Sequence, residues 1–152
     1  MKAATIRPAR PDEAEVLTAL AIRSKAHWGY DDTFMAACVD ELTMTPGRVR
    51  TANLLVAEVE GALKGMAGLE RDGDGWEVCM MFIDPAAIGT GLGKLLFLAL
   101  MDQARDMGID ALNIDADPNA ESFYLRMGAV TVGRVASGSI PGRMIPQLLL
   151  RL

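Results

Sequence analysis

The chain has 152 residues and a formal net charge of −5; 51% of its residues are hydrophobic and 23% are charged. These values predict one folded domain over residues 1–152, and the negative charge argues against a nucleic-acid partner. The longest unbroken apolar run, 95–101, is too short to cross a bilayer, and no signal peptide is recognisable, so we expect a cytoplasmic protein without a membrane partner. Cys38 and Cys79 are interpreted as buried free thiols of a reducing compartment, and the single histidine gives no basis for a metal site.

The N-terminal third shows a strand pattern followed by two helix patterns. The strand is expected at 4–8, and the first helix runs from about Pro11 to Ala26 with Asp12 as its cap. The second helix begins at Asp31-Asp32, and Thr45-Pro46-Gly47 is expected to stop it.

Three strands are expected next, at 54–59, 62–69 and 76–83. The short turn at Glu60-Gly61 and the glycine-rich turn at 71–75 predict an antiparallel meander. Gly65 and Gly68 are expected to weaken the middle strand.

A glycine-rich loop then leads into a long helix at 94–107, which is expected to be largely buried and to end at Gly108. A strand at 111–116 follows, so the crossover predicts that this strand runs parallel to 76–83. The remaining expectations are a short helix at 120–127 capped by Asn119, and strands at 130–135 and 145–150 joined by the loop Ser137–Arg143. The pattern predicts one α+β domain with a mixed sheet.

The loop from Ile88 to Lys94 has glycines at positions 89, 91 and 93. Glycine lets backbone N–H groups approach a ligand closely, and the start of a helix attracts anions, so a phosphate site is predicted here. The spacing fits neither a P-loop, because Leu95 follows Lys94, nor a dinucleotide fingerprint, because the glycines are strictly alternate.

Ile83-Asp84-Pro85 precedes the loop 88–93, and the segment 119–129 reads Asn-Ala-Glu-Ser-Phe-Tyr-Leu-Arg-Met-Gly-Ala. These two motifs together resemble those of the GNAT N-acetyltransferase superfamily. The first is similar to the family's acetyl-CoA signature, and the second is similar to its Asn-Ala-x-x-Phe-Tyr-x-x-x-Gly-Phe motif with Ala129 in place of the final Phe. The element order matches over nearly the whole chain. The resemblance implies an α/β/α sandwich whose mostly antiparallel sheet has about seven strands and a central parallel pair.

The resemblance further implies acetyl-CoA as cosubstrate and no metal. The residues that would contact acetyl-CoA are Phe82, Ile83, Ile88, Gly89, Thr90, Gly91, Leu92, Gly93, Lys94, Asn119 and Tyr124. Ile88 departs from the Gln or Arg of the signature, which removes one polar contact near the phosphates.

Acetyl transfer to an amine requires a base for the amine proton and an acid for the departing thiolate. The family places its acid at Tyr124, although its helical spacing also fits a core tyrosine. Glu77 is the candidate base, because even spacing in a regular strand puts it on the same face as Ile83. Asp115 and the pair Asp31-Asp32 are the alternative carboxylates.

The family's acceptor pocket corresponds here to His27, Trp28 and Tyr30, with Arg143 on the opposite wall. Aromatic rings beside acidic groups would suit a cationic amine. The pattern alone favours a core position for Trp28. The resemblance thus implies transfer of an acetyl group to a primary amine, with a homodimer as a possible assembly; the alternative is a non-catalytic acyl-CoA-binding regulatory domain.

Overall fold

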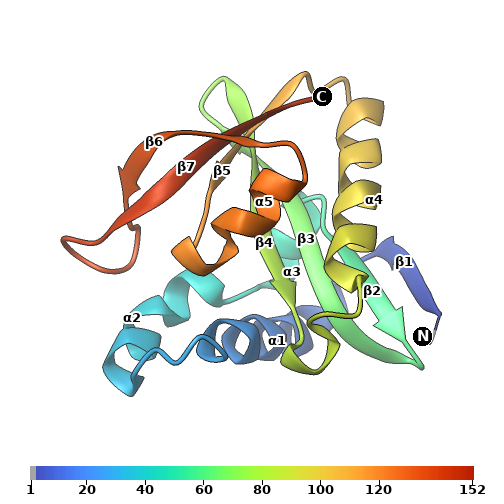
Figure 1. The fold of residues 1–152 in the computed structure, drawn as a ribbon. Helices are drawn as coiled ribbons and strands as arrows, with labels where there is room; N and C mark the ends of the chain where they lie inside the picture. The colour runs from blue at the N-terminus through green and yellow to red at the C-terminus, as the bar shows by residue number, and fades with distance from the viewer. Residues whose placement is uncertain (1–2) are drawn as a thin grey trace.

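The computed structural model describes residues 3–152 as a twisted seven-stranded sheet with helices on both faces (Figure 1). The strand order is β1-β2-β3-β4-β5-β7-β6, and only β4 and β5 among the described strands pair in parallel. The strands are β1 (Ala4–Pro8), β2 (Leu55–Val59), β3 (Ala62–Asp72), β4 (Gly75–Ile83), β5 (Ala111–Asp115), β6 (Val130–Ala136) and β7 (Met144–Arg151). The expected mixed sheet with a central parallel pair is therefore confirmed.

Five α-helices and three single 3-10 turns connect these strands in the described part of the chain. They are η1 (Pro11–Glu13), α1 (Ala14–Ala26), α2 (Asp32–Leu42), α3 (Pro46–Thr51), η2 (Pro85–Ala87), α4 (Leu92–Asp106), η3 (Pro118–Ala120) and α5 (Glu121–Arg126). One hydrophobic core lies between the sheet and α4 with α5, and a second lies between the sheet and α1 with α2 and α3. No helix in the described residues is long and apolar enough to span a membrane.

Helix α4 buries one stripe rather than most of its surface. Its buried residues follow helical spacing along one side: Leu92, Leu96, Phe97, Leu100, Met101 and Ala104. Leu95 and Leu98 are 45% and 48% exposed, so the expectation of a largely buried helix is wrong. The helix ends as expected, because Gly108 adopts φ +77° directly after Met107.

Three local expectations are wrong for identifiable reasons. Thr45 does not stop a helix but begins α3: its hydroxyl accepts a hydrogen bond from the Arg48 N–H at 3.1 Å, with proline at the first helical position. Asp12 is not the first cap, because Glu13 instead accepts from the Arg10 N–H at 2.8 Å. Asn119 does not cap α5 either; its own N–H donates to Asp117, which caps η3.

The glycines of β3 permit close packing instead of weakening the strand. A Cβ at Gly65 would lie 2.9 Å from the Ile83 side chain, and one at Gly68 would lie 2.6 Å from the Ala52 carbonyl oxygen. Both glycines are buried, and the strand continues to Asp72. Strand β3 can therefore approach both β4 and the segment that follows α3.

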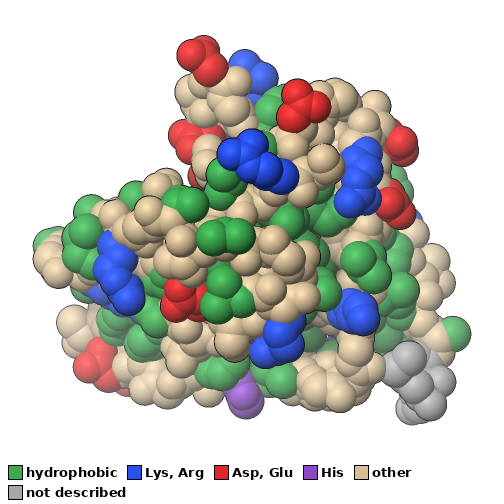
Figure 2. Space-filling model, turned by 45° about the horizontal axis from the view of Figure 1, so that its top comes forward, with side chains coloured by type: hydrophobic (Ala, Val, Ile, Leu, Met, Phe, Trp, Pro, Cys, Tyr) green, Lys and Arg blue, Asp and Glu red, His purple; other side chains and the backbone are tan. Residues whose placement is uncertain are grey.

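The surface carries charges of both signs. On the face in Figure 2, basic and acidic side chains are scattered among hydrophobic ones, without a large area of one sign. The net charge of −5 is therefore not concentrated on this face.

Candidate functional site

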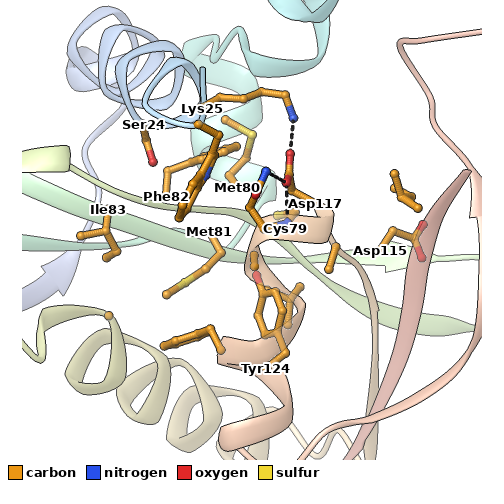
Figure 3. Close-up of a pocket in the computed structure, with 18 of the residues that line it drawn as sticks. Ser24, Lys25, Cys79, Met80, Met81, Phe82, Ile83, Asp115, Asp117 and Tyr124 are labelled. Atoms are coloured by element: carbon orange, nitrogen blue, oxygen red, sulfur yellow. Dashed lines mark hydrogen bonds and ion pairs between the residues drawn. The ribbon is translucent and has the colours of Figure 1, made fainter. Parts of the chain in front are cut away.

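A cavity of about 1190 Å³ lies where β4 and β5 separate. The two strands pair at Glu77 and Asn113. Farther along, the cavity is lined on one side by residues 80–83 of β4. On the other side it is lined by Asp115, the last residue of β5, and by the two residues that follow it. Figure 3 shows these residues, with Tyr124 rising from α5 below them and Lys25 reaching in from α1 above. Side chains from both faces of the sheet therefore meet in one cavity.

The glycine loop forms one end of this cavity. Gly89 and Gly91 have φ of +81° and +86°, and apart from their chain neighbours no heavy atom of residues 3–152 lies within 4 Å of the Cβ that either would carry in another residue. Gly93 instead packs closely, since its Cβ would lie 3.4 Å from the Phe123 ring. The first two glycines therefore expose backbone to the cavity, and the third lets α4 approach α5.

The first turn of α4 has unused hydrogen-bond donors. The first bond of the helix runs from the Leu95 N–H to the Gly91 carbonyl, and within residues 3–152 the N–H groups of 92, 93 and 94 have no protein acceptor. Lys94 and Ile88 are exposed beside them and line the cavity. Free N–H groups at a helix start beside a lysine are the kind of groups that attract an anion.

Two residues of this loop that are expected to contact acetyl-CoA, Thr90 and Leu92, do not direct their side chains into the cavity, so only their backbone could contact it. The Leu92 side chain is 5% exposed and belongs to the core. The Thr90 hydroxyl donates to the Ala87 carbonyl at 2.5 Å, and Thr90 does not line the cavity.

Strand β4 carries a bulge beside the cavity. Phe82 pairs with Met66 and Cys79 pairs with Gly68, so two residues of β4 oppose Ala67, and Met80 adopts φ +51°. Ile83 packs against the core under α4, whereas Cys79 packs against the core under α1. Glu77 shares the Cys79 face by alternation, so the expectation that Glu77 and Ile83 share a face is wrong.

The bulge also decides which backbone donors point into the cavity. The Asp84 N–H donates to the Lys64 carbonyl of β3 at 2.8 Å. Because N–H directions alternate along an antiparallel strand, the Phe82 N–H points to β3 and the Ile83 N–H points away from it, toward β5. Of the two β4 residues that are expected to contact acetyl-CoA, Phe82 and Ile83, only Ile83 therefore directs its backbone N–H at the space between the parallel strands.

Tyr124 is buried, and its ring packs edge-on against Phe97 and Phe123. Its hydroxyl makes no hydrogen bond within residues 3–152, although it is not sealed from the cavity that the residue lines. Burial raises the pKa of the phenol above its ordinary value, so the hydroxyl keeps its proton at neutral pH. Tyr124 thus combines the predicted core packing with a free donor.

Glu77 is half-buried in the same cavity, on the strand opposite Asn113. Burial raises the pKa of its carboxyl to about 7, and the neighbouring carboxylates of Asp72 and Asp115 act in the same direction. A carboxyl with this pKa exchanges a proton readily at neutral pH. Of the alternative carboxylates, Asp115 lines the cavity, whereas Asp31 and Asp32 do not.

Tyr30 belongs to a polar cluster that sequence reasoning missed. Its hydroxyl donates to Asp117 Oδ2 at 2.7 Å and accepts from Arg143 Nη2 at 2.8 Å and Asn119 Nδ2 at 3.1 Å. Burial opposes ionisation of Asp117, but hydrogen bonds from the Asn119 backbone and from Tyr30 outweigh it and lower the pKa. Lys25 Nζ lies 3.4 Å from the same carboxylate.

Of the remaining residues that are expected to form the pocket for the amine acceptor, some line the cavity and others do not. Trp28 is 44% exposed and lines the cavity, so its expected core position is wrong. His27 is exposed and contacts the Trp28 ring edge-on outside the cavity lining. Tyr30 itself does not line the cavity but holds Arg143 and Asp117, which do. The expected acidic lining from Asp31 is wrong as well, since that side chain caps α2 through the Phe34 N–H.

The thiols differ from each other. Cys38 is buried, whereas Cys79 is only partly buried and lines the cavity, so the expectation of two buried thiols holds for Cys38 alone. Burial and a hydrogen bond with Glu70 raise the Cys79 pKa, which leaves the thiol protonated and a poor nucleophile.

Comparison with known proteins identifies the family of this chain. The acetyltransferase (GNAT) domain model matches residues 15–138, and no curated protein matches the chain. A GCN5-related N-acetyltransferase structure from Rhodopseudomonas palustris is 26% identical, with a TM-score of 0.82 over 100% of this chain and 98% of that one.

Two structures with bound ligand show the same fold. PaiA N-acetyltransferase from Thermoplasma acidophilum, in complex with coenzyme A, is 16% identical, with a TM-score of 0.78 over 99% of each chain. YncA from Salmonella typhimurium, with acetyl-CoA, is 22% identical, with a TM-score of 0.71 over 98% of this chain and 94% of that one. Because the domain model covers more than half of its length, the chain belongs to the GNAT acetyltransferase family.

Proposed function

We propose that this protein is an N-acetyltransferase that moves the acetyl group of acetyl-CoA directly to a primary amine. One observation supports this most: the N–H groups of Gly93 and Lys94 and the Tyr124 hydroxyl, which have no partner within residues 3–152, border one cavity together with the Glu77 carboxyl. An anion site, a proton donor and a proton acceptor are the groups that the reaction needs.

The chain's residues fit acetyl-CoA, which would supply the acyl thioester. The N–H groups of 92–94 would bind its pyrophosphate, and Lys94 would contribute a positive charge. The open backbone at Gly89 and Gly91 leaves room for the phosphates, since nothing lies within 4 Å of their Cβ positions. The Ile83 N–H, directed between β4 and β5, would hold the pantetheine arm or the carbonyl oxygen.

The proton transfers follow from the same geometry. Glu77 would accept the proton that the amine loses as its nitrogen bonds to the carbonyl carbon, and its pKa of about 7 suits that role. Tyr124 would donate its hydroxyl proton to the thiolate as the carbon–sulfur bond breaks. The raised pKa of the buried phenol keeps that proton available.

Two measurements on the purified protein test the proposal. Acetyl-CoA is expected to raise the melting temperature, while NAD and ATP leave it unchanged, because the loop spacing fits neither nucleotide motif. Thiol release from acetyl-CoA is then measured against a panel of amines, and amine-dependent release is expected. No thermal shift with acetyl-CoA would contradict the donor assignment, whereas a shift without release for any amine would favour a regulatory acyl-CoA-binding domain.

A homodimer and a cytoplasmic location stay predictions. Sedimentation at several concentrations tests the first, and fractionation of cells tests the second.

A further inference from the structure

Two cations share one carboxylate at the end of the cavity nearest α1. Lys25 Nζ lies 3.4 Å and Arg143 Nη2 lies 3.6 Å from Asp117 Oδ2, and the three side chains are 13%, 19% and 16% exposed. We call Lys25, Arg143 and Asp117 the basic cluster. Its formal charges sum to +1, and all three residues line the cavity. A largely buried excess of positive charge favours an anionic partner.

Arg143 is fixed in place but not saturated. Its guanidinium lies over the rings of Phe34 and Tyr30, 4.8 and 5.2 Å from their centroids, and one nitrogen donates to the Tyr30 hydroxyl. A guanidinium has five N–H donors, and within residues 3–152 its other two nitrogens have no hydrogen-bond acceptor. A planar fork with free donors beside a cavity suits a carboxylate.

Acidic groups face another part of the cavity. Asp115 lies two residues before Asp117, and Glu77 pairs with Asn113, which lies four residues before it. At about 3.3 Å per strand residue, these acids are separated from the basic cluster by about 7–13 Å along the sheet. Figure 3 shows Asp115 apart from the Lys25–Asp117 pair.

The other charged groups around the cavity do not cancel this polarity. Arg48 is paired with Glu70 at 2.9 Å, so this pair adds no net charge. Glu41 is exposed on α2, Lys94 belongs to the proposed phosphate site at the start of α4, and Arg126 is the last residue of α5.

The loop 137–143 crosses toward α2 and narrows the acceptor side. A Cβ at Gly138 would lie 2.6 Å from Glu41 Oε1, and Ser139 Oγ lies 3.5 Å from Cys38 Sγ. Contacts from the far end of the sheet to α2 thus bridge the cavity, which favours a small acceptor over a long polypeptide.

We infer that the acceptor is a small amine that also carries a carboxylate, with the carboxylate bound by Arg143 and Lys25 and the amine directed toward Glu77. This inference rests on the proposed N-acetyltransferase function and adds the class of acceptor.

Matched acceptors test it. Amino acids with the amine in the α, β or γ position are each compared with the corresponding carboxamide in the thiol-release assay, and aminoalkylphosphonates of equal length are included. For at least one amino acid, kcat/KM is expected to exceed that of its carboxamide by about 10–100-fold. This is the effect expected from the charge-assisted hydrogen bonds that Arg143 and Lys25 would donate to the carboxylate.

Variants locate the effect. Arg143→Gln is expected to raise the KM for the amino acid by about 10–100-fold and to leave the carboxamide nearly unchanged, so the acid-to-amide ratio approaches one. Arg143→Lys should recover part of the ratio. Arg134→Gln, an exposed arginine on β6 outside the cavity lining, is the control and should keep the ratio. If Arg143 has only a structural role, its replacement should lower kcat/KM equally for the amino acid and for its carboxamide.

The outcomes separate the two proposals. Acetylation of amines with no acid-to-amide preference, a preference for phosphonates, or a ratio unchanged in Arg143→Gln would overturn the carboxylate inference while the N-acetyltransferase function stands. No acetylation of any amine would overturn both.

Discussion

Glu77 and Ile83 lie on opposite faces of β4, although their positions in the sequence differ by six, an even number. The bulge at Met80 inserts one residue between them, so Ile83 faces α4 while Glu77 faces the side of α1 and α3. The same cavity reaches both, because β4 and β5 separate beyond their pairing at Glu77. The proposed base on one face therefore borders the same cavity that a thioester would enter from the other face.

Replacing Glu77 by Gln should lower kcat/KM by about 100-fold and alter its pH dependence. In the native protein the rate should rise as the pH passes through about 7, because the carboxyl must lose its proton to act as base. Glu77→Gln should lack that inflection. Asp74→Asn, which removes an exposed carboxylate from the turn between β3 and β4, is the matched control. An inflection near pH 7 that survives in Glu77→Gln would assign the base elsewhere.

Tyr124→Phe should lower kcat by about 100-fold and change the free energy of unfolding by less than about 0.5 kcal/mol. The hydroxyl has no hydrogen bond to lose within residues 3–152, whereas the ring keeps its contacts with Phe97 and Phe123. Tyr30→Phe is the contrast, since loss of its bond to Asp117 should cost about 1–2 kcal/mol. Thiol-release kinetics and urea unfolding measure both; strong destabilisation with unchanged kcat would make Tyr124 a packing residue only.

Gly91→Glu and Gly91→Gln separate charge from strain at the glycine loop. Both side chains must adopt φ of +86°, so both variants should lose about 1–2 kcal/mol of stability. Only the glutamate places a negative charge at the start of α4, and it should weaken acetyl-CoA binding far more than the glutamine does. Calorimetric titration with acetyl-CoA makes the comparison. Equal affinities of the two variants would contradict a phosphate site at this position.

The sequence predicted what depends on local chemistry. Glycine spacing and a following helix are sufficient to predict an anion site at 89–93, and a helix does begin there, at Leu92. A capping threonine before proline is a helix-start signal, so Thr45 and Pro46 are sufficient to predict the start of α3 as well as the end of the preceding helix.

Long-range contacts were beyond sequence reasoning. Tyr30, Asp117 and Arg143 lie far apart in the chain, and no spacing rule brings one hydroxyl to both partners. The bulge at Met80 has no glycine to indicate it, so regular alternation predicts the wrong face of β4 for Glu77 relative to Ile83. The residue type of Trp28 favours a core position, whereas the structure leaves the side chain partly exposed in the cavity lining.

Ile88→Gln should tighten acetyl-CoA binding by about 3–10-fold. Ile88 is 43% exposed at the cavity where the resemblance expects a polar side chain, so an amide there gains a phosphate partner without losing core packing. The melting temperature without ligand should stay nearly constant. Val16→Gln, at an exposed position on α1, is the control for surface polarity. Titration calorimetry measures the dissociation constants, and an unchanged or weaker constant in Ile88→Gln would argue against phosphate contacts from this position.

Glu13→Gln should destabilise the fold by about 1–3 kcal/mol at pH 7. Glu13 joins η1 to β1 through Arg7, with 2.7 Å between Oε2 and Nη2, and the hydrogen bond from Arg7 overcomes burial to lower the pKa of Glu13 to about 2. The folded-state pKa lies below the unfolded value of about 4.3, so this stabilisation is fully present above that value and is lost as the pH falls through about 2.

Urea unfolding at pH 7, 4 and 2.5 should therefore show a difference between the native protein and Glu13→Gln that shrinks with acidification. Glu15→Gln, an exposed position in the first turn of α1, should match the native protein at every pH. Only the charged form of Glu13 is stabilised by Arg7. If the difference in the free energy of unfolding stays constant down to pH 2.5, the effect of Glu13→Gln therefore comes from packing rather than from the ion pair with Arg7.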